Sequence, residues 1–200
     1  MDSRSPNQGA APGRRPALDA HADDVGARLR RLREERGVSL SALARRAGVG
    51  KATLSGLENG TRNPTLETLY AVTAALGVPL AAVLAEPGAG APARVRGAAV
   101  EATLLEVFED GTVTYELYRL RVPPGPVQTS PAHHAGVTEH ITVFAGALRA
   151  GPVDSPQVAR AGEHISWQSD VPHVYQAYGD EEVLASLVVR YPRRSPATVP

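Results

Sequence analysis

Apolar residues recur every three or four positions across residues 23–84, and this spacing predicts short helices that each bury one face. The clearest part, over residues 37–64, predicts two helices joined by a tight turn. Ser39 stands just before the first apolar position, where its hydroxyl can cap the first turn. Gly48 follows the last apolar position and can end the helix in a left-handed conformation. A second helix then runs over residues 50–58.

The flanking sequence predicts three further helices. One covers residues 23–35, with apolar positions facing inward and arginines spread round its outside. Another begins after Pro64 with Thr65 as its cap and ends at Gly77, and a short last helix covers residues 79–84. We therefore expect an all-α N-terminal domain of five helices.

From residue 98 onward the pattern changes to alternation of apolar and polar residues, with Gly and Pro recurring between short runs. This is typical of an antiparallel sandwich or barrel, and Asp110-Gly111 is a hairpin turn signal. The fold class we expect is α+β in two domains, with an all-α domain followed by an all-β sandwich or barrel. The strand candidates cover residues 99–108, 112–122, 138–149, 163–168, 173–178 and 183–190.

Composition supplies the expected boundaries. Residues 1–20 contain too few apolar side chains to offset the entropy of ordering, so we expect a disordered arm. Residues 87–97 are rich in Pro, Gly and Ala and are expected to form a linker. The expected helical domain covers 21–86, the barrel 98–193 and a tail 194–200.

Charge and cysteine content limit the classes of protein to which this chain can belong. The chain has 21 basic and 21 acidic residues, but residues 1–97 carry 14 basic against nine acidic ones, and residues 98–200 carry the reverse imbalance. Only the first half therefore suits a phosphate backbone. There is no cysteine, no signal-peptide core and no apolar run long enough for a membrane helix, so we expect a cytoplasmic protein with no membrane partner.

We expect the helix over residues 50–58 to leave one side exposed. Such a helix can enter the major groove of B-DNA, which is about 12 Å wide and admits one helix. The alternative to DNA binding is an ordinary helical hairpin. Contacts to the DNA phosphate backbone lie on either side of such a helix, so basic residues before and after it are candidates for these contacts. The candidate DNA-binding residues are Ser41, Arg45, Arg46, Gly50, Lys51, Ala52, Thr53, Ser55, Gly56 and Arg62.

Several spaced motifs carry a family resemblance here: Ser39-Leu40-Ser41, Leu43-Ala44, Gly48-Val49, Thr53-Leu54-Ser55, Glu58-Asn59-Gly60 and Pro64-Thr65-Leu66-Glu67. With these, residues 25–84 resemble the DNA-binding domain of the phage-repressor-like (XRE/Cro) helix-turn-helix family. The resemblance implies binding to double-stranded DNA. Ser41 and Gly56 depart from the family pattern, which often has long polar side chains there.

Five of the six histidines lie between His133 and His173. The spacing His133-His134-x4-Glu139-x6-Gly146, followed by Gly162-Glu163 and Pro172-His173, resembles the two motifs of the cupin family. The resemblance implies a small jelly roll whose pocket holds a divalent metal (Fe, Mn, Ni or Zn) or, where metal binding has been lost, an organic ligand. The candidate pocket residues are His133, His134, Glu139, His173, Tyr175 and Trp167.

The adjacent histidines leave two arrangements open. If His134 takes the second histidine place of the motif, the first falls on Ala132 and His133 points away, because strand residues two apart share a face. In the other arrangement His133 faces inward. His140 and His164 are expected to be ordinary strand residues.

Together these resemblances imply a transcriptional regulator whose cupin domain senses a small molecule or metal and joins two chains. A homodimer on a pseudo-palindromic operator would place two such helices about 34 Å apart. One alternative is a mononuclear-metal cupin oxygenase or epoxidase with a helix-turn-helix-like domain. Another is a constitutive DNA binder whose barrel only dimerises.

Overall fold

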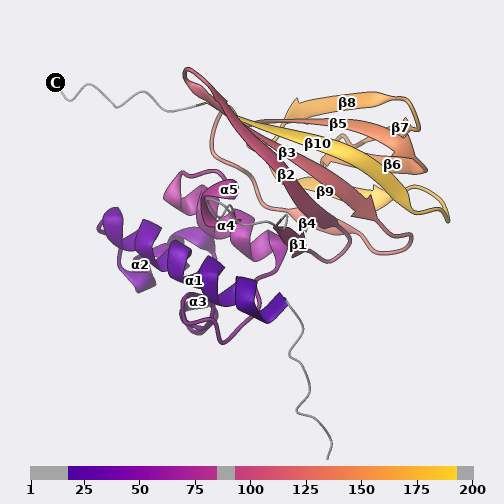
Figure 1. The fold of residues 1–200 in the computed structure, drawn as a ribbon. Coiled ribbons are helices and arrows are strands. Elements are labelled where there is room, and N and C mark those ends of the chain that lie inside the picture. Colours follow the sequence, from indigo (N-terminus) through magenta and orange to yellow (C-terminus); the bar gives the residue numbers. More distant parts are fainter. Residues whose placement is uncertain (1–17, 85–92, 193–200) are drawn as a thin grey trace, which may run out of the picture.

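The computed structural model describes residues 18–84 and 93–192, which form a helical half followed by an all-β half (Figure 1). The first helix begins at Leu18, five residues earlier than the sequence pattern predicted. The expected tail, most of the expected arm and residues 87–92 of the expected linker lie outside the described residues. The helices are α1 (Leu18–Glu35), α2 (Leu40–Ala47), α3 (Lys51–Glu58), α4 (Leu66–Leu76) and α5 (Ala81–Leu84).

Local signals set the helix ends. The Ser39 hydroxyl accepts a hydrogen bond from the Ala42 N–H at 3.2 Å, and Gly48 ends α2 with a φ of 65°. The Thr65 hydroxyl caps α4 in the same manner, and Gly77 ends it with a φ of 67°. These predictions are confirmed, because each depends on a few neighbouring residues only.

Within residues 93–192, ten antiparallel strands form two sheets with the orders β1-β2-β3-β10-β5-β8 and β4-β9-β6-β7. The non-sequential neighbours give the jelly-roll arrangement that the cupin resemblance implied. The strands are β1 (Arg94–Arg96), β2 (Glu101–Asp110), β3 (Val113–Val122), β4 (Gln128–Ser130), β5 (Thr138–Ala145), β6 (Ala147–Pro152), β7 (Gln157–Arg160), β8 (His164–Gln168), β9 (His173–Ala177) and β10 (Val183–Pro192).

The expected strand over residues 138–149 is divided into β5 and β6 at Gly146. Gly146 has a φ of 73°, and a Cβ there would lie 2.8 Å from the Glu182 carbonyl oxygen, so only glycine fits the corner. Three short strands, β1, β4 and β7, were not predicted, because three or four residues are too few to show alternation. β1 lies within the interval expected to be the linker and pairs with β2.

The two halves pack directly against each other. Buried side chains of the helices and of the sheets form one continuous cluster. α4 and α5 lie nearest the sheets, beside β4 and β2 (Figure 1). Two carboxylates fix this arrangement: the Ala98 N–H donates to Glu67 Oε1 at 2.7 Å, and the Ala81 N–H donates to Glu116 Oε1 at 2.5 Å. Among the helices of the described residues, none has the length and apolarity needed to cross a bilayer.

Candidate DNA-binding face and candidate metal site

The N-terminal end of α3 is exposed, as the groove-binding hypothesis requires. Lys51 and Ala52 in the first turn are exposed, whereas Leu54, one turn further along, is fully buried. Half-buried positions follow at Thr53 and Ser55. Among the remaining candidates, Gly56 is half-buried, and Ser41, Arg45, Arg46, Gly50 and Arg62 are exposed.

Gly56 is covered by Arg62. The N–H groups of Thr61 and Arg62 donate to the Gly56 carbonyl oxygen at 2.9 and 3.2 Å, which folds the chain back over α3. A Cβ at Gly56 would lie 3.0 Å from Cγ and Cδ of Arg62. The missing side chain at this position therefore makes room for the Arg62 stem. Gly56 was expected to face DNA; it is half-buried beneath the Arg62 stem, and Arg62 itself is exposed.

Arg33 holds α1 to α3. Its Nε and Nη2 atoms donate to the two carboxylate oxygens of Glu58, each at 2.7 Å, and Nη1 donates to the Val38 carbonyl oxygen at 3.0 Å. Arg28 Nε likewise donates to the Val83 carbonyl oxygen at 2.8 Å. The expectation that the arginines of the first helix lie on its outside is thus wrong for Arg33, which orients α3 instead.

In the β half, three candidate pocket residues meet in the interior. His133 comes from the loop before β5, Glu139 from β5 and His173 from β9. His133 Nε2 lies 2.8 Å and His173 Nε2 lies 3.2 Å from Glu139 Oε1. One nitrogen or oxygen from each residue lies within 4.8 Å of the others, and all three side chains are buried. We call these residues the trio.

The surroundings orient each member of the trio. His173 donates from Nδ1 to the Val171 carbonyl oxygen at 2.9 Å, which directs Nε2 toward Glu139. Tyr175 donates its hydroxyl to Glu139 Oε2. The backbone N–H of His133 donates to the Ser169 carbonyl oxygen at 2.9 Å. Each residue of the trio is therefore held by a hydrogen bond to a residue outside the trio.

The trio is electrostatically coupled. Burial by itself raises the pKa of Glu139, but the two facing imidazoles outweigh burial and lower that pKa well below its ordinary value. Burial by itself lowers the pKa of His173, and the Glu139 carboxylate raises it above the ordinary value. The ionised carboxylate therefore favours a positive charge beside it.

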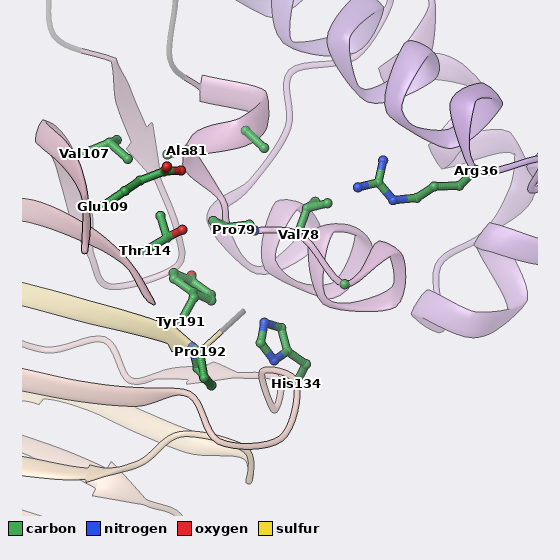
Figure 2. Close-up of a pocket in the computed structure, with 12 residues that line it drawn as sticks. Arg36, Val78, Pro79, Ala81, Val107, Glu109, Thr114, His134, Tyr191 and Pro192 are labelled. Atoms are coloured by element: carbon green, nitrogen blue, oxygen red, sulfur yellow. The ribbon is translucent and has the colours of Figure 1, made fainter. Parts of the chain in front are cut away.

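His134 does not join the trio. It lines a cleft of about 580 Å³ between the helical and β halves, beside Tyr191 and Pro192 (Figure 2). The opposite wall carries Arg36, Val78 and other helical residues. His134 was a candidate for the pocket, and the structure assigns that place to His133. The loop register decides this, because adjacent residues point in different directions.

Aromatic residues enclose the trio. Trp167, a pocket candidate, has its ring centroid 6.0 Å from that of His173, and it is buried like Tyr175. His140 and His164 stack with each other on the outer face of the larger sheet, 5.8 Å apart, as ordinary strand residues. The imidazole ring of His133 also lies edge-on to the rings of Tyr191 and of Tyr70, a residue of α4.

Comparisons with known proteins agree with both halves. The sequence model of the helix-turn-helix family HTH_3 matches residues 29–83. The HTH-type transcriptional regulator SutR of Escherichia coli (strain K12) is 30% identical over 166 residues, which cover 82% of this chain and 93% of SutR. The chain belongs to the HTH-type transcriptional regulators.

Two further relatives extend the comparison. SinR of Bacillus subtilis (strain 168) is 41% identical over 63 residues, 31% of this chain and 57% of SinR. A crystal structure of an HTH_3 family transcriptional regulator from Vibrio cholerae aligns with a TM-score of 0.74 at 26% identity, covering 88% of this chain and all of that one. This HTH-type regulator therefore joins a DNA-binding helix-turn-helix half to a jelly-roll β half, and α3 is the candidate reading helix.

Two buried residues of the regulator were missed at the sequence level. Tyr70 and Glu116 both lie where α4 and α5 meet the sheets. A signal for Tyr70 was present: it is an aromatic residue just off the apolar stripe of its helix, and a helix with apolar residues on two sides is expected to be buried on both. Glu116 also had a signal, since it shares a strand face with Tyr118, Leu120 and Val122, and a carboxyl on an apolar face is expected to be buried.

Proposed function

We propose that the cupin half of this regulator binds a divalent transition-metal ion at the trio and that occupancy changes operator affinity. The observation that carries the proposal is the position of His173 Nε2. This buried atom makes no hydrogen bond of good geometry within the described residues, although Glu139 Oε1 lies 3.2 Å away. Because Nδ1 donates to Val171, Nε2 is the nitrogen that faces the carboxylate. The Glu139 carboxylate favours a cation at this position, and a metal ion bound by both atoms would take the place of a proton on Nε2.

The donor set indicates the class of ion. Two imidazoles and one carboxylate suit Fe, Mn, Ni or Zn, and three protein ligands leave coordination positions open. A bound ion would supply the positive charge that Glu139 favours and would give a small-molecule effector an anchoring point. Tyr175 would orient the carboxylate, and the Val171 carbonyl would orient His173.

The DNA-binding half is proposed to act on a pseudo-palindromic operator as part of a homodimer. Lys51 is the one long side chain among the candidates on α3, with Arg45, Arg46 and Arg62 beside it for the phosphates. One such helix offers few base contacts, so a second copy about 34 Å away would be needed for specific binding. Sedimentation of the purified protein, with and without operator DNA, tests the dimer.

The experiment that tests metal sensing is elemental analysis of the purified protein, joined to operator titrations. We expect about one transition-metal ion per chain, as three dedicated ligands imply. The ion should be lost in His133→Ala and retained in His134→Ala, which removes the neighbouring imidazole outside the trio. Operator affinity should change on chelation in the wild type and in His134→Ala only. An ion that survives in His133→Ala, or equal operator affinity with and without metal, would refute the proposal.

A second candidate function is metal-dependent oxidation. Two histidines and one carboxylate with open positions are also the ligand set of non-haem iron oxygenases. Against this, three clefts of the described residues, one lined by Val78, one by Gln176 and one by Val100, have no trio residue in their walls, so these clefts do not bring a substrate to the site. Iron-dependent oxygen uptake by the purified protein would favour the enzyme.

A further inference from the structure

The helical half contributes a side chain to the surroundings of the trio. Tyr70 lies on α4, yet its ring stands edge-on to the imidazole of His133, with centroids 4.7 Å apart and planes at 81°. The ring is 3% exposed. Burial first, and then the nearby carboxylates of Glu139 and Glu116, raise the pKa of the Tyr70 phenol well above its ordinary value. Tyr70 is therefore a neutral aromatic wall beside a candidate metal ligand.

This wall belongs to a rigid part of the helical half. α4 buries Leu66, Leu69 and Val72, and it buries Tyr70 and Thr73 as well. The Glu67 carboxylate one turn earlier accepts the Ala98 N–H, which fixes α4 against the chain entering the sheets. Tyr70 thus cannot leave His133 without a shift of α4.

Three aromatic rings surround His133. His173 stacks on it at 5.4 Å with planes 27° apart, and Tyr191 meets it edge-on at 6.0 Å. Tyr70 is the nearest of these rings. His133 itself is on a loop, held by its backbone contact with Ser169, whereas Glu139 and His173 are on strands. The loop histidine therefore depends most on neighbouring side chains for its orientation.

We infer that Tyr70 is a positioning residue of the metal site, supplied by the DNA-binding half, and that metal and operator binding are coupled through α4. The inference rests on the proposed function of the trio. Rotation of the His133 ring toward a shared ion changes its packing against Tyr70, and α4 packs on α2, which precedes the reading helix. By linkage, metal must then change operator affinity by the same factor by which operator changes metal affinity.

The test uses the full-length protein with Co²⁺ as the probe, because its visible absorption reports ligand number and geometry. Tyr70→Leu removes the ring and keeps an apolar side chain, Tyr70→Phe keeps the ring, and Thr73→Ala is a matched change one turn further along α4. We expect Co²⁺ affinity to fall by about 10- to 100-fold in Tyr70→Leu, as for loss of other residues that orient metal ligands. Tyr70→Phe and Thr73→Ala should retain wild-type affinity.

The second measurement is the coupling between Co²⁺ binding and operator binding. In the wild type, operator titrations with and without Co²⁺ give a ratio of affinities, and this ratio should approach one in Tyr70→Leu. A structural role alone would lower stability but leave the Co²⁺ spectrum and the ratio unchanged. A folded Tyr70→Leu protein with wild-type affinity, spectrum and ratio would overturn the inference while the metal proposal stands. Absence of Co²⁺ binding in the wild type would overturn both.

A measurement on the wild type covers the case in which Tyr70→Leu does not fold. The ring resonances of Tyr70, assigned by their loss in Tyr70→Phe, should shift when Zn²⁺ is added and again when operator DNA is added. Resonances that respond to neither addition would overturn the inference.

Discussion

Arg33 on α1 and Glu58 at the end of α3 form a two-pronged ion pair, with both N–H···O distances at 2.7 Å and side chains only 11% and 4% exposed. Glu58→Ala leaves the Arg33 guanidinium with only the exposed carboxylate of Glu34, 3.3 Å away. Loss of one partner of a buried pair costs about 3 kcal/mol. Urea denaturation should show this loss. Glu182→Ala, which removes the exposed partner of Arg121, is the control and should change stability little. Equal effects of the two substitutions would contradict the assignment.

Gly26 allows α1 to cross α3 closely. A Cβ at Gly26 would lie 2.1 Å from the Leu57 carbonyl oxygen, so the helices must separate to admit alanine. The helix propensity of alanine contributes about 1 kcal/mol, whereas overpacking costs about 3 kcal/mol. Gly26→Ala should therefore lower the free energy of unfolding by about 2 kcal/mol, measured by urea titration. Ala27→Ser, an exposed change at the next residue, serves as the control, and a stable Gly26→Ala protein would show that the crossing is not tight.

Features that depend on neighbouring residues could be predicted from the sequence, whereas features that depend on distant residues could not. Ser39 and Gly48 were assigned correctly because a cap depends on neighbours within one turn. The inward orientation of His133 instead depends on Ser169, which is far along the chain and lies in the loop after β8. The Arg33–Glu58 pair also joins distant residues, so neither its existence nor the burial of Arg33 could be derived from helical spacing.

The buried carboxyl of Glu116 joins the halves and should make stability depend on pH. Burial raises the pKa of Glu116 to about 7, and hydrogen bonds from the Ala81 N–H and from Tyr118 offset burial in part. An unfolded Glu titrates near pH 4.3, so the folded state binds more protons between about pH 4.3 and 7. This contribution to stability is fully present below that window and is lost as the pH rises through it, on the order of 3 kcal/mol.

Glu116→Gln isolates this contribution. Its amide oxygen can still accept from Ala81, but it does not titrate. The stability of the wild type relative to Glu116→Gln should therefore fall between pH 4.5 and 7 and level off above pH 8, as measured by urea denaturation at each pH. Parallel pH profiles of the two proteins would show that Glu116 does not titrate in this window.

The last prediction concerns the DNA face. Arg62 lies over Gly56, beside α3. We predict that Arg62 contacts phosphate, so Arg62→Ala should weaken binding equally on all sequences and reduce the salt slope by about 1. Gly56→Gln should have a similar effect with Arg62 still present, because the new side chain takes the place of the Arg62 stem. Lys51→Ala tests the exposed start of α3 in the same titrations.

Fluorescence anisotropy with specific and random duplexes at several salt concentrations distinguishes the roles. A loss confined to the specific duplex would make Lys51 a base contact, whereas a uniform loss with a shallower slope would make it a phosphate contact. Arg36→Ala is the matched control, because Arg36 faces the cleft between the halves and should leave DNA affinity nearly unchanged. If Arg62→Ala and Arg36→Ala behave alike, the position of Arg62 over Gly56 has no role in binding.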